Sequence, residues 1–181
     1  MEGEVRGVRG PDVGLWRRCR TEVRKLDRAV GLNGPIDASS FLARLAEHRG
    51  RPIELRPFNQ GDVPGGVCGI WVDRSDSDVI GYPVDARHAL HIVLHEVGHM
   101  LRGHRGRAPV ADSQIASFMP DLDPTMVRAV LGRSVYSDVE EREAELIASL
   151  IMSRADGSRG PGPAPVAGDA VAHRVRRVFG G

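Results

Sequence analysis

The sequence predicts an α+β protein in which a small antiparallel sheet lies between helices in chain order. Three short β-like runs fall together between residues 52 and 83, and helical patterns come before and after them. A parallel sheet would instead require strands that alternate with helices. The chain has 181 residues, of which 41% are hydrophobic, a length and composition that suit a single domain with its own core.

Two amphipathic helices are expected in the first part of the chain. Residues 11–30 place apolar side chains at helical spacing, and residues 36–50 repeat the pattern with Asp37 or Ser39 near the start and Gly50 as the stop. Residues 1–10 are polar and rich in glycine, so a flexible N-terminus is predicted there.

The three β-like runs follow. They read PIELRPF (52–58), GVCGIWV (66–72) and VIGYP (79–83), with turn signals at NQGD and RSDSD between them. This order predicts an antiparallel meander of three strands.

The second half of the chain is mainly helical by its pattern. Residues 85–101 carry an apolar stripe, 123–132 resemble a short helix, and 137–155 form the last long helical pattern. The domain is therefore expected to span residues 11–155. The Gly/Pro-rich segment 156–181 is predicted to be a disordered tail.

Composition argues against several classes of function. A net charge of +1 without a concentrated basic face gives no reason to expect direct binding of nucleic acid. Cys19 and Cys68 are far apart and form no CxxC pair, so neither a disulfide framework nor a cysteine-bound zinc is expected. The N-terminus resembles no secretory signal, and the longest strongly apolar run, 146–152, is too short to span a bilayer. A cytoplasmic protein is the default expectation.

The chemistry-bearing motif is HIVLHEVGHM, residues 91–100. On a helix, His95 and His99 lie one turn apart on one face, where both can bind one ion. Glu96 lies beside them, and the arrangement is the HExxH motif of zinc hydrolases, with the glutamate as general base. Two histidines that merely lie in the core or on the surface are the alternative.

A catalytic zinc ion needs a third protein ligand. The helix 137–155 carries four glutamates, and Ser137 with Glu140 forms the pattern of a capping box. Glu141 and Glu145 share one face, whereas Glu143 falls within the apolar stripe. Periodicity alone leaves Glu141 and Glu143 open as the third ligand.

LHEVGH followed by EREAELIASLIM resembles the ImmA/IrrE family of bacterial zinc metallopeptidase-like proteins, in particular short actinobacterial members of the toxin–antitoxin type. The resemblance covers about residues 35–155. It implies a zincin-like fold with the sheet packed against the HExxH helix, Zn²⁺ as cofactor, His95, His99 and Glu141 as ligands, and Glu96 as catalytic base. The chain departs from the family pattern at Glu145, where asparagine or aspartate is usual, and at Ile147 and Ser153.

The resemblance further implies a gluzincin-like metallo-endopeptidase that cleaves a regulatory protein, such as a helix-turn-helix repressor or an antitoxin. A catalytically silent regulator that acts by protein binding is the alternative, and a zinc hydrolase of small molecules is a third. Tyr136, Tyr82 and His104 are the candidate donors for the oxyanion of the reaction. His88 and His91 are candidates for the surroundings of the metal, and the segment 105–135 is a candidate lid.

Overall fold

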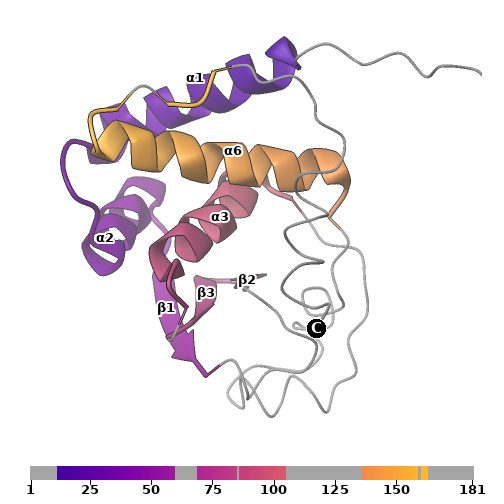
Figure 1. Ribbon diagram of the computed structural model, residues 1–181. Helices are drawn as coiled ribbons and strands as arrows, with labels where there is room; N and C mark the ends of the chain where they lie inside the picture. The colour runs from indigo at the N-terminus through magenta and orange to yellow at the C-terminus, as the bar shows by residue number, and fades with distance from the viewer. Residues whose placement is uncertain (1–11, 60–68, 85, 105–135, 159, 163–181) are drawn as a thin grey trace, which may run out of the picture.

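The computed structural model describes residues 12–59, 69–84, 86–104, 136–158 and 160–162. These ranges contain four helices and three strands, which confirms the α+β class (Figure 1). The helices are α1 (Val13–Val30), α2 (Ala38–Arg49), α3 (Ala89–Arg102) and α6 (Asp138–Ala155), and the strands are β1 (Ile53–Phe58), β2 (Ile70–Asp73) and β3 (Asp78–Pro83). The predictions for residues 1–10, the helix 123–132, the segment 105–135, Cys68 and the tail beyond residue 162 lie outside the described residues.

Helix boundaries follow the polar signals in the sequence. The Asp37 side chain accepts a hydrogen bond of 2.8 Å from the Ser40 amide at the start of α2, and Gly50 ends that helix with a φ of 63°. At the start of α6, the predicted capping box of Ser137 and Glu140 is present in both directions.

The antiparallel meander predicted for the sheet is wrong. The strand order is β1-β3-β2, with β3 antiparallel to β2 but parallel to β1. The residues of β3 are buried almost throughout, whereas those of β1 are half-buried or exposed except for the buried Phe58. A strand buried on both faces belongs in the centre of a sheet, and so β3 takes a partner on each side.

A buried aspartate fixes the parallel pair. Asp78, which is fully buried at the start of β3, accepts hydrogen bonds from Arg49 at 2.7 Å, from Arg51 at 3.1 Å and from the Trp71 indole at 2.9 Å. Arg49 ends α2 and Arg51 lies two residues before β1, so these contacts hold Ile53 opposite Asp78 in the parallel register. Side-chain contacts between residues distant in sequence therefore decide the pairing.

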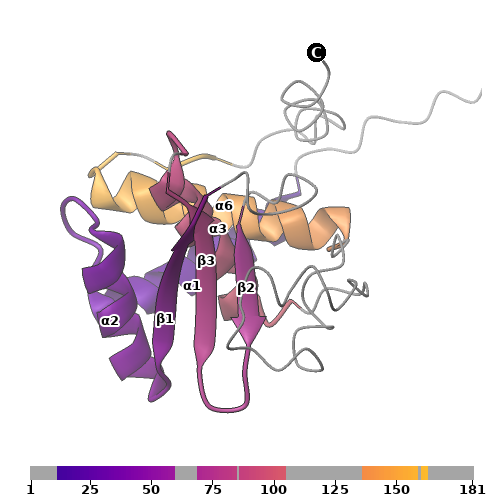
Figure 2. The same cartoon turned by 90° about the horizontal axis from the view of Figure 1, so that it is seen from below.

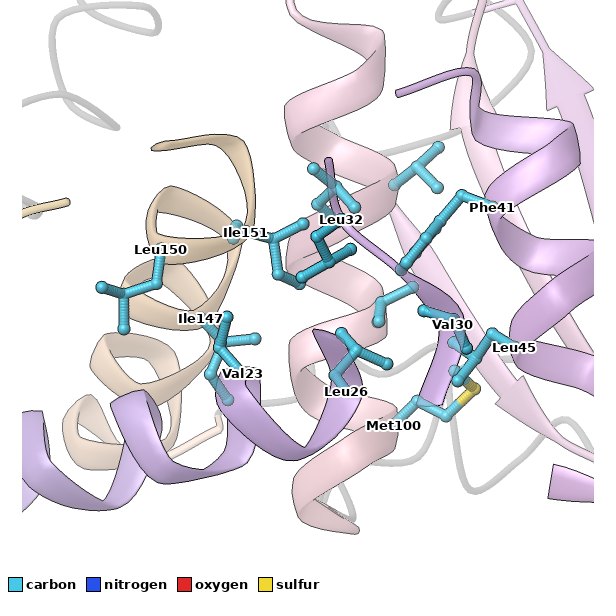
Figure 3. Close-up of a cluster of buried hydrophobic side chains, with 14 of the residues drawn as sticks. Val23, Leu26, Val30, Leu32, Phe41, Leu45, Met100, Ile147, Leu150 and Ile151 are labelled. Atoms are coloured by element: carbon cyan, nitrogen blue, oxygen red, sulfur yellow. The ribbon is translucent and has the colours of Figure 1, made fainter. Parts of the chain in front are cut away.

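The helices form layers on the sheet. In Figure 1, α3 lies between the sheet and α6, and α1 lies along the far side of α6; Figure 2 shows α2 beside β1 at the edge of the sheet. The core lies where α1, α2, α3 and α6 meet, and its largest fully buried side chains include Phe41, Leu45 and Ile151 (Figure 3). None of the helices in the described ranges is long and apolar enough to cross a membrane.

Candidate metal centre

Helices α3 and α6 approach each other closely where the HExxH motif lies. A Cβ atom added to Gly98 would come within 2.8 Å of the Ala144 Cα atom. Ala144 and Ala148 are both fully buried. Because glycine faces alanine here, the backbones can come close, and α6 brings its carboxylates beside the histidines.

The structure brings His95, His99 and Glu141 together. The Nε2 atoms of the two histidines are 3.0 Å apart, and Glu141 Oε2 lies 3.4 Å from His95 Nε2 and 4.0 Å from His99 Nε2. Three ligands at about 2.1 Å from a tetrahedral zinc ion would be about 3.4 Å from one another. The three atoms therefore have the spacing that a divalent ion requires, although such a donor set is not specific to zinc.

Glu143, the other carboxylate that periodicity left open, faces away from this group. It is buried, and its oxygens accept hydrogen bonds from Arg18 at 3.4 Å, Arg102 at 3.2 Å and His104 Nε2 at 3.0 Å. Burial alone would raise the pKa of Glu143, but the hydrogen bonds from His104 and the two arginines outweigh it and lower that pKa. Glu143 is thus an ionised carboxylate that is already fully engaged.

The two histidines of the motif differ in their electrostatic environment. Burial disfavours the charged form of both rings. Around His95, the carboxylates of Glu141 and Glu145 outweigh burial and raise its pKa. For His99, burial together with the neighbouring His95 and His104 rings lowers the pKa, so this imidazole is neutral. A neutral imidazole is the form that binds a metal.

Glu96 lies in a water-poor environment beside the histidines. It is 6% exposed, and burial raises its pKa to about 7, with His95 opposing and Glu141 adding to the shift. The residue directly before β2 lies close by, since a Cβ atom on Gly69 would lie 2.7 Å from Glu96 Oε1. Glycine at this point leaves room for the Glu96 side chain against the strand.

The remaining residues of the sequence prediction take different places. His91 Nε2 lies 2.9 Å from Glu145 Oε2, and the same oxygen is 3.7 Å from His95 Nδ1. His91 therefore belongs to the surroundings of the candidate centre. His88 is exposed at the start of α3 and makes no side-chain capping bond.

The three candidate oxyanion donors are separated by the fold. The Tyr136 ring stacks on the His99 ring, with centroids 3.7 Å apart. Burial raises the pKa of the Tyr136 hydroxyl, and the nearby carboxylates of Glu96 and Glu141 raise it further. His104 lies against the Nδ1 edge of His99, on the side opposite the converging Nε2 atoms. Tyr82 packs against the hydrophobic core. Tyr136 is the candidate that shares the environment of Glu96 and Glu141.

The contact of His104 with both His99 and Glu143 is not predicted from the sequence. The sequence does contain a signal for it, because the helix-ending Gly103 follows the helical pattern directly and places His104 at the end of that helix.

Comparison of the chain with protein-family models, with curated proteins and with solved structures finds no match.

Proposed function

We propose that the protein is a zinc-dependent metallo-endopeptidase of the ImmA/IrrE type with a zincin-like fold. The observation that carries the proposal is the convergence of His95 Nε2, His99 Nε2 and Glu141 Oε2 within 4.8 Å of one another, with buried Glu96 next to them. Two imidazoles, one carboxylate and a neighbouring glutamate are the set that zinc hydrolases use.

Each residue of the candidate site has its own proposed role in the reaction. His95, His99 and Glu141 would hold the ion, which when bound polarises the scissile carbonyl and lowers the pKa of water. Glu96 takes a proton from the attacking water and delivers it to the leaving amine. Tyr136 is the proposed hydrogen-bond donor to the oxyanion because it stacks on His99 beside the other site residues.

The position of Glu96 against a strand supports a polypeptide substrate. The start of β2 runs beside the carboxylate at Gly69, and among the described strands β2 pairs with β3 alone. An extended peptide can add to a sheet edge through main-chain hydrogen bonds, and an edge strand that begins next to Glu96 fits a substrate of this kind. A cavity of about 390 Å³ lies elsewhere, between α1 and α6, and no site residue lines it. A regulatory protein, such as a helix-turn-helix repressor or an antitoxin, is the proposed substrate.

The test compares wild type with Glu96→Gln at equal zinc content, with a peptide library whose cleavage products are read by mass spectrometry. Loss of a general base lowers the rate by about 10²–10⁴-fold, whereas the ligands of the ion are untouched. Zinc retained with cleavage lost would support the proposal. Equal cleavage by both proteins would exclude Glu96 as the base, and no cleavage by wild type would favour the catalytically silent regulator.

A further inference from the structure

The end of α3 places a second histidine against His99. Gly103 has a φ of 63°, its amide donates to the Met100 carbonyl at 3.2 Å, and the His104 amide donates to the His99 carbonyl at 3.0 Å. This pair of bonds is a Schellman motif, in which the residue after the glycine packs against the residue five positions before it. That contact is usually apolar, whereas here both partners are imidazoles.

The contact continues to a carboxylate on α6. The Nδ1 atoms of His99 and His104 are 3.1 Å apart, and His104 Nε2 is 3.0 Å from Glu143 Oε2. His104 is 6% exposed and Glu143 is 5% exposed, so water competes little for these bonds. A continuous, buried chain of hydrogen bonds thus links α6 to the ring of His99.

The chemistry of the groups fixes the direction of this chain. An ionised carboxylate only accepts hydrogen bonds, so Nε2 of His104 must carry the proton. With its single proton on Nε2, the His104 ring offers a lone pair at Nδ1, which lies 3.1 Å from Nδ1 of His99 and accepts from the Nδ1–H of that ring. Neutral His99 is left with its own lone pair on Nε2, the atom that lies 3.0 Å from His95 Nε2. Glu143 thereby determines which nitrogen of His99 can bind a metal.

We propose that His104 and Glu143 are positioning residues that fix the tautomer and orientation of His99, so that its Nε2 lone pair faces the candidate metal centre. The inference rests on the metal centre of the proposed function. Arg18 and Arg102 contribute by donating to the two oxygens of Glu143, which holds that carboxylate in place beside His104. Loss of such a hydrogen bond behind a histidine ligand typically lowers metal affinity by about 10–100-fold.

The first test measures the Zn²⁺ dissociation constant of the full chain by competition with a chromophoric chelator. His104→Leu should weaken binding by about 10–100-fold, because no acceptor remains for the Nδ1–H of His99. His104→Asn should stay within a few-fold of wild type, since its amide oxygen replaces the Nδ1 acceptor. His88→Leu removes an exposed histidine from the start of α3 and should bind as wild type does. Glu143→Gln keeps the shape and should also weaken binding.

The second test reads the tautomer itself, which a merely structural role would not alter. Nitrogen-15 NMR of histidine-labelled, metal-free protein should show the proton of His99 on Nδ1 and none on Nε2. A proton on Nε2 of His99 in wild type would overturn the inference, as would unchanged zinc affinity in both His104→Leu and Glu143→Gln. Wild type that binds no zinc would overturn the metal centre and this inference together. If wild type binds zinc but the His104 and Glu143 variants bind it equally well, only the positioning role of His104 and Glu143 is overturned.

Discussion

The close contact of α3 with α6 makes Gly98→Ala an informative perturbation. The new methyl group would lie 2.8 Å from the Ala144 Cα atom and 2.9 Å from its carbonyl oxygen. Carbon atoms in ordinary contact are about 3.5 Å or more apart, so α6 must move by roughly 0.7 Å. Because the contacted atoms belong to backbone, no flexible side chain can move aside instead.

The expected change in the free energy of unfolding follows from two opposing effects. Overpacking of this kind costs about 1–3 kcal/mol, whereas replacing glycine by alanine within a helix contributes about 1 kcal/mol of stability. Because the contacted backbone is rigid, the overpacking cost should fall in the upper half of that range. The free energy of unfolding should therefore decrease by about 1–2 kcal/mol. Glu141 lies one turn before Ala144 on α6, and a shift of that size exceeds the tolerance of about 0.2 Å in metal–ligand distances. Zinc affinity should fall with stability.

Urea unfolding of the metal-free protein and zinc titration form the assay, with Gly14→Ala as the matched control. A Cβ atom at Gly14, in α1, would meet its nearest atoms at 3.4 and 3.5 Å, which are ordinary contacts. This control should be neutral or gain up to about 1 kcal/mol, with unchanged zinc affinity. If Gly98→Ala were as stable as Gly14→Ala and bound zinc normally, the close approach of α3 and α6 would be refuted.

Three further predictions concern the same framework. Gly69→Ala should lower peptidase activity and leave zinc content unchanged, because its methyl group would collide with the side chains of Ile92 and Glu96; equal activity would contradict the placement of Gly69 beside that carboxylate. Cys19 is fully buried and burial, with Glu143, raises its pKa to about 11, so in a Cys68→Ser variant it should react with iodoacetamide only after denaturation, and rapid native labelling would contradict its burial. Ser137→Ala removes the capping box of α6 and should cost about 0.5–2 kcal/mol in urea unfolding, whereas an unchanged midpoint would show that the cap contributes nothing.

The helices could be predicted from sequence because their signals are local. Asp37, Gly50 and the Ser137–Glu140 pair lie within a few residues of the boundaries that they set. Strand pairing is not local in this sense. The parallel register of β1 depends on Asp78, which meets Arg49 and Arg51 from a distant part of the chain, and no periodicity encodes that contact.

The candidate site likewise has one part that local sequence signals predict and another that depends on distant contacts. The spacing of His95 and His99 on one helix places both on one face, as i and i+4 always do. Whether Glu141 or Glu143 meets them depends on how α6 rotates against α3, which periodicity left open. In the structure, the contacts of Glu143 with Arg18, Arg102 and His104 turn it away and leave Glu141 beside the two histidines.

The proposed function requires that three side chains from α3 and α6 hold one metal ion. Zinc content of the purified protein tests it most directly, measured for wild type beside His99→Ala and Glu141→Ala after zinc reconstitution and dialysis. We expect about one zinc per chain in wild type and loss of that zinc in both variants. Zinc retained in Glu141→Ala, or none bound by wild type, would contradict it.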